Sequence, residues 1–135
     1  MLSSRNSGFQ GLPRSLRLAA AASVIILAAG LYLLGAQALA VGLFPAPWDR
    51  LAHATTFAVV GSATGLASGT RGWRMVVYCV AGAVVVGAVD ELHQTFLPGR
   101  SASWADFGAD LAGGLIGAAL LGMGYAAMQW RARRH

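Results

Sequence analysis

Ionisable side chains gather in one stretch of an otherwise apolar sequence, VDELHQTFLPGRSASWADFGAD over residues 89–110. This stretch contains four of the five acidic residues of the chain, which are Asp90, Glu91, Asp106 and Asp110. The fifth, Asp49, lies in a shorter polar stretch, PAPWDRLAH over residues 45–53. Because the carboxylates are confined to two short segments, we expect the segments to meet and to form a single polar site.

The spacing within these stretches is helical. Three pairs of polar residues are separated by four positions and therefore share a helix face: Asp49 with His53, Asp90 with Gln94, and Asp106 with Asp110. Glu91 points about 100° away from Asp90, so the two neighbouring acids need not serve the same site. The face of Asp106 and Asp110 continues to Gly113 and Gly117, which would let this helix pack closely while its acids face the bundle.

Three chemistries are compatible with these residues. Carboxylates with His53 and His93 can bind a divalent cation, although no motif with a fixed metal spacing is present. Arg50 and Arg100, with the Ser101 and Ser103 region at a helix start, can hold a phosphate or carboxylate. A carboxylate and a histidine can act as general acid and base on a lipid headgroup. No G-x-S-x-G, H-E-x-x-H or glycine-rich phosphate loop occurs, so we assign no nucleophilic serine, metal ligand or cofactor.

Each of these residues also has a structural interpretation. Asp49, after Pro47, can be an N-cap, and Ser103 with Asp106 fits a capping box. His53 can be a hydrogen-bonded interior histidine. Arg100 can be a counter-ion of Glu91 that closes a loop.

The composition indicates a membrane protein. Hydrophobic residues make up 56% of the 135 residues and charged residues only 11%, about half of what a soluble domain carries. The single cysteine, Cys79, excludes a disulfide framework and a cysteine metal cage. All ten basic residues are arginines that flank apolar segments, without the basic face that a nucleic-acid partner requires.

The hydropathy predicts an all-α protein, a four-helix bundle integral to the membrane. Residues 1–17 form a polar segment, spans follow at about 18–44, 49–68, 75–95 and 104–130, and 131–135 form a basic tail. The first span is expected to be peripheral, and the second, which carries His53 and several hydroxyls, to be buried among helices. A cleaved signal peptide ending near Ala36-Gln37-Ala38 is the alternative for the first span, which is longer than such peptides usually are.

The arginines predict the orientation. Eight of the ten fall on one side of four spans and only Arg50 and Arg100 on the other, so both termini should be cytoplasmic. Every acidic residue then lies near the outer face. At 1.5 Å per helical residue, Asp110 lies about 9 Å below Trp104, and His53 about 6 Å below Asp49. Ionisable groups at such depth normally face the bundle interior.

Three motifs together resemble the VanZ-like membrane proteins. They are Asp49-Arg50-x-x-His53, then Asp90-Glu91-x-x-Gln94 running into Pro98-Gly99-Arg100-Ser101, and Asp106-x-x-x-Asp110-x-x-Gly113. The resemblance covers about residues 48–121. Arg50 stands where lysine is commoner in the family, and Asp110 where asparagine is usual. The resemblance implies a small multi-pass protein of the bacterial inner membrane, in a family whose namesake is associated with low-level resistance to the glycopeptide teicoplanin.

We therefore expect a polar site between the second, third and fourth spans that recognises an anionic lipid-linked or peptidoglycan-related headgroup. Arg50 and Arg100 would hold the anion, Glu91, Asp106 and Asp110 would orient it or exchange protons, and His53 would tune them. The expected ligand-binding set is completed by Asp49, Asp90, Gln94 and Ser101. Two alternatives remain, an intramembrane enzyme acting on a lipid headgroup and a structural or partner-binding module. Membrane lipids are the expected partners, and a homo-oligomer is left open.

Overall fold

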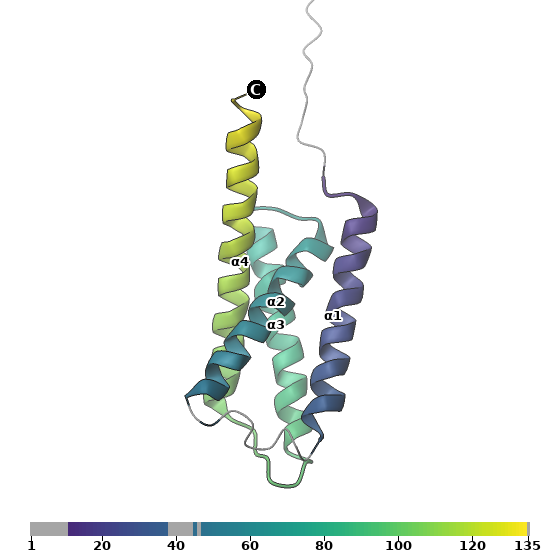
Figure 1. Cartoon of the computed structure of the whole chain (residues 1–135), viewed down its shortest axis with the longest axis vertical. Coiled ribbons are helices and arrows are strands. Elements are labelled where there is room, and N and C mark those ends of the chain that lie inside the picture. Colours follow the sequence, from purple (N-terminus) through teal and green to yellow (C-terminus); the bar gives the residue numbers. More distant parts are fainter. Residues whose placement is uncertain (1–10, 38–44, 46, 135) are drawn as a thin grey trace, which may run out of the picture.

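A computed structural model describes residues 11–37, 45 and 47–134, and all the regular structure in these ranges is helical. The helices are α1 (Arg14–Gly35), α2 (Trp48–Ser68), α3 (Trp73–Gln94) and α4 (Trp104–Ala132). Figure 1 shows them as an upright bundle in which α2 runs obliquely between its neighbours. The predicted all-α class with four helices is confirmed.

Three of these helices, α1, α3 and α4, are long and apolar enough to cross a membrane, so the chain is a multi-pass membrane protein. The fourth, α2, has 21 residues but is not apolar enough to be counted with them. It packs against all three other helices and buries Phe57, Val60 and Gly61. Its polar composition therefore matches a position inside the bundle, as the sequence predicts.

The helix bounds differ from the expected spans mainly in α1. This helix begins at Arg14, four residues early, and ends at Gly35 instead of near residue 44. The helix ends at a glycine, a residue that destabilises helical structure. The last carbonyls of a helix have no partner inside it, and the carbonyl of Leu33 accepts a hydrogen bond from Gln37 Nε2 at 3.1 Å. Residues 1–10 of the expected N-terminal segment, residues 38–44 of the expected first span and Ala38 of the cleavage motif lie outside the described residues. Only Ala20 of α1 is buried, which agrees with a peripheral helix.

The start of α2 corrects one structural interpretation of Asp49. The helix begins at Trp48 after Pro47, so Asp49 lies in the first turn and is not the N-cap. Pro47 occupies the N-cap position, and its side chain makes no capping hydrogen bond. At the other terminus, α4 extends to Ala132, into the expected basic tail.

The two ends of the bundle differ in charge. The start of α1, the turn between α2 and α3 and the end of α4 lie at one end, at the top of Figure 1. The described arginines of this end are Arg14, Arg17, Arg71, Arg74, Arg131, Arg133 and Arg134. All five acidic residues belong to the opposite helix ends, which we call the acidic end.

Glycines bring α2 and α4 into backbone contact. A methyl group on Gly113 would lie 2.5 Å from the Ala54 carbonyl oxygen, and one on Gly117 would lie 2.5 Å from that of Ala58. Gly61 on α2 also lies close to α4, because a methyl group there would be 3.0 Å from the α carbon of Gly114. The predicted small-residue packing is thus present, and it sets how deeply the acids of α4 reach toward α2.

Arg17 attaches the peripheral α1 to the end of α2. Its Nε donates to the Ala67 carbonyl at 3.1 Å and its Nη2 to the Ser68 carbonyl at 3.2 Å. These are among the last carbonyls of α2, which have no partner inside their helix. Gly69 then ends the helix with φ of 65°, a conformation that glycine adopts readily.

Candidate functional site

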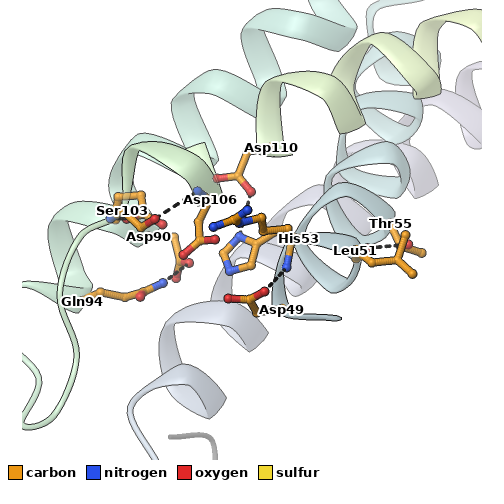
Figure 2. A network of polar contacts seen from close by, with 11 residues as sticks. Asp49, Leu51, His53, Thr55, Asp90, Gln94, Ser103, Asp106 and Asp110 are labelled. Atoms are coloured by element: carbon orange, nitrogen blue, oxygen red, sulfur yellow. Dashed lines mark hydrogen bonds and ion pairs between the residues drawn. The ribbon is translucent and has the colours of Figure 1, made fainter. Parts of the chain in front are cut away.

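A pocket of about 670 Å³ lies at the acidic end, between α1 and the polar ends of the other helices. Its apolar wall comes from α1 and includes Ile26, Leu27, Leu31 and Leu34. Its polar wall contains seven of the ten expected site residues: Asp49, His53, Asp90, Gln94, Arg100, Ser101 and Asp106. Figure 2 shows the side chains of α2, α3 and α4 converging here.

The other three expected residues do not line the pocket. Arg50 is exposed on the first turn of α2 and lies outside the lining. Glu91 and Asp110 are buried, and Asp110 contacts His53, which does line the pocket. The two segments that hold the carboxylates therefore meet as expected, and two of the acidic residues, Glu91 and Asp110, are buried outside the pocket lining.

His53 and Asp110 join α2 to α4. Nδ1 of His53 lies 2.8 Å from Oδ1 of Asp110, and Asp110 is 0% exposed while His53 is 19% exposed (Figure 2). The sequence predicts that both deep groups face the interior, and the structure confirms this. It does not predict that they contact each other, because they are 57 residues apart.

The neighbouring acids Asp90 and Glu91 face different surroundings. Asp90 lines the pocket, and its Oδ2 accepts a hydrogen bond from Gln94 Nε2 at 2.8 Å. Glu91 Oε2 accepts from the backbone N–H of Ser103 at 2.5 Å, which ties the end of α3 to the start of α4. The difference in direction follows the helical rotation between adjacent residues.

Ser103 has the capping role that its position predicts. Its hydroxyl oxygen accepts from the backbone N–H of Asp106 at 3.2 Å at the start of α4. This contact occupies the N–H of Asp106 and leaves its carboxylate among the pocket residues. Ser103 thus has a structural role, whereas Asp106 lines the pocket.

His93 is separated from the polar cluster. Its ring stacks on Tyr32 of α1 with centroids 3.7 Å apart, and it is not among the residues that line the pocket. A cation site that uses both His53 and His93, which the sequence allows, is therefore not assembled. One atom each of His53, Glu91 and Asp110, however, lie within 4.8 Å of one another.

Gly87 is a residue of the site that sequence reasoning misses. A methyl group at this position would lie 2.6 Å from Asp110 Oδ2 and 3.1 Å from Asp110 Cβ. The absence of a side chain on α3 thus makes room for the buried carboxylate of α4. The available signal is its spacing, because Gly87 precedes Glu91 by one helical turn and shares its face.

Replacing Gly87 with alanine should displace the Asp110 carboxylate and destabilise the protein by about 1–3 kcal/mol, the usual range for overpacking. The unfolding free energy of the purified protein in detergent measures this effect. Gly108→Ala on α4 is the matched control, because a methyl group there meets nothing within 4 Å. Equal stability of the two variants would contradict the assigned role of Gly87.

Comparison with known proteins identifies the family. The family model described as VanZ/LLP1 matches residues 30–125, most of the chain, and the chain belongs to this family. The match includes every expected site residue. No curated protein and no solved structure matches the chain.

Proposed function

We propose, with membership of the VanZ/LLP1 family as the premise, that this chain binds the headgroup of an anionic lipid at the outer face of the bacterial inner membrane. The observation that carries the proposal is the pocket of about 670 Å³ with an apolar wall on one side and a polar wall on the other. An amphiphile is the class of ligand that matches both walls. The volume is within the range of pockets that bind small molecules.

The charge distribution supports the orientation. Seven described arginines lie at the end opposite the acids, and cytoplasmic loops of membrane proteins are rich in basic residues. Both termini are then cytoplasmic and the pocket opens near the outer leaflet. We include α2 as a fourth span, because its 21 residues extend about 32 Å, close to the hydrocarbon thickness, and it packs against all three other helices.

The polar wall limits the chemistry of the headgroup. Arg100 supplies a guanidinium that can hold phosphate or carboxylate through paired N–H groups. Asp49, Asp90 and Asp106 supply carboxylates, which accept hydrogen bonds and repel a second anion. The ligand that satisfies both is a lipid-linked phosphate with hydroxyl or amino donors, such as a glycosyl phosphate. Arg50 lies outside the pocket lining, so the proposal assigns the anion to Arg100.

A second candidate function is an intramembrane enzyme acting on the same headgroup. The observation that favours it is the His53 and Asp110 pair at the pocket, with Nδ1 and Oδ1 2.8 Å apart. A carboxylate that orients an imidazole is a common arrangement for general acid and base catalysis. Turnover of a retained lipid by the wild type, lost in His53→Gln, would favour the enzyme over the binding protein.

The test is the lipid retained by the purified protein, identified and quantified by mass spectrometry, for the wild type and Arg100→Gln. A hydrogen bond to a charged group contributes about 1.5–3 kcal/mol, so retention of the anionic lipid should fall about 10- to 100-fold. Arg133→Gln, an exposed arginine at the opposite end of the bundle, is the matched control and should retain the lipid. Equal retention by a folded Arg100→Gln protein would refute the proposal and favour a structural module.

A further inference from the structure

We propose that His53, Glu91 and Asp110 form a binding site for a divalent transition-metal ion, with Zn²⁺ as the best-matched ion. The three residues come from α2, α3 and α4, and one ligand atom of each lies within 4.8 Å of the others. The metal proposal does not rest on the lipid-binding proposal, because that proposal assigns the anion to Arg100, and of the three metal ligands only His53 lines the pocket.

Two carboxylate oxygens of this cluster are buried without a hydrogen-bond partner among the residues that the structure describes. They are Asp110 Oδ2 and Glu91 Oε1. Both side chains are more than nine-tenths buried, with Asp110 0% and Glu91 7% exposed. A buried acceptor without a partner is costly, and buried polar atoms in native proteins are nearly always satisfied. A cation bound between the three side chains would satisfy both oxygens.

The excess of negative charge around the cluster also favours a bound cation. Two buried carboxylates lie near a single imidazole, which contacts only that of Asp110. Asp90 and Asp106 add negative charge at the neighbouring pocket, where Arg100 is the one arginine among the lining residues. Excess buried charge of one sign strongly destabilises a fold unless a counter-ion is present. A divalent cation neutralises two carboxylates directly. A proton shared by the carboxylates is the competing solution, and the experiment below separates the two.

The donor set selects the class of ion. One imidazole nitrogen and two carboxylate oxygens suit Zn²⁺ and neighbouring transition metals, whereas Mg²⁺ prefers oxygen ligands alone. Three protein ligands are also the number in zinc sites that keep one position for water or substrate. The Ser103 N–H that holds Glu91 Oε2 would orient the carboxylate from the outer shell and leave Oε1 for the ion.

The test is a metal titration of the full-length protein in detergent. The protein is stripped with EDTA, dialysed separately against Zn²⁺, Mn²⁺ and Mg²⁺, and its metal content is measured by mass spectrometry. The wild type should bind about one Zn²⁺ per chain. Loss of an outer-shell partner already costs 10- to 100-fold in affinity, so Asp110→Asn or Glu91→Gln should weaken Zn²⁺ binding by about 100-fold or more. Asp49→Asn, a pocket carboxylate outside the cluster, should bind Zn²⁺ as the wild type does.

Three outcomes would overturn the proposal. If the wild-type protein binds none of the ions, a proton and not a metal ion neutralises the carboxylates. This result comes from the wild type alone, so it does not depend on whether any variant folds. Binding of Mg²⁺ alone would exclude the imidazole as a ligand. Unchanged Zn²⁺ affinity in folded Asp110→Asn and Glu91→Gln would place the ion elsewhere. Lipid retention by the wild type and Arg100→Gln, measured separately, distinguishes failure of the lipid proposal from failure of the metal proposal.

Discussion

Replacing Gly117 with leucine should force α4 away from α2 and destabilise the bundle by about 3 kcal/mol or more. Already the first carbon of the new side chain would lie 2.5 Å from the Ala58 carbonyl oxygen and 2.9 Å from the Ser62 backbone nitrogen. These are backbone atoms of a packed helix, which cannot move aside as a flexible side chain can. Because stabilities of native proteins are about 5–15 kcal/mol, a loss of this size is large.

The unfolding free energy in detergent measures the effect, with helicity by circular dichroism as a second readout. Gly122→Leu is the matched control, because it makes the same change on the same helix at a position with nothing within 4 Å. The control should be neutral or slightly stabilising, since leucine favours a helix more than glycine does. If both variants are equally stable, the close packing of α2 and α4 does not stabilise the protein.

Replacing His53 with leucine should destabilise the protein by about 3 kcal/mol, the upper end of the usual cost of leaving a buried acceptor without its hydrogen-bond partner. The change leaves Asp110, which is 0% exposed, without the imidazole that lies 2.8 Å from its Oδ1. Unfolding of the stripped protein in EDTA isolates this contribution from any bound metal. Asp110→Asn should be tolerated better than His53→Leu, because it removes the charge that needs a partner.

A double variant tests whether the unpaired Asp110 causes the loss of stability in His53→Leu. Leucine at both His53 and Asp110 should recover most of the stability, because apolar replacements of a buried pair are often neutral. His93→Leu is the control for losing a histidine ring, since His93 stacks on Tyr32 and does not belong to the pair. A His53→Leu protein as stable as His93→Leu would show that Asp110 does not depend on His53.

Most of the fold could be predicted because it follows from local properties. Apolar runs of about 20 residues predict helices of membrane-spanning length, and α2, α3 and α4 begin and end within two residues of their expected bounds. The glycine spacing predicts the packing face of α4, with Gly113 and Gly117 against α2. The end of α1 is less predictable, because apolarity continues past Gly35 and hydropathy cannot show where a helix stops.

The polar cluster is predicted as a set of residues but not as a geometry. Spacing shows that Asp90 and Gln94 share a face, and their hydrogen bond follows from it. Spacing cannot show that Arg50 lies outside the pocket while its neighbour Asp49 lines it. The two side chains leave the helix in different directions, and only the packing of the helices decides which direction faces the pocket. It also cannot show that α1, the helix without acidic residues, supplies the apolar wall.

The sequence by itself determined that the chain is helical, that it belongs in a membrane and that its acids meet at one end. Hydropathy and helical period are properties of single segments, so they can be counted along the chain. Only the tertiary structure decided that His53 contacts Asp110, that Glu91 turns toward Ser103 and that Gly87 makes room for a carboxylate. Each of these contacts depends on the distance and rotation between two helices, which the packing of all four helices sets together.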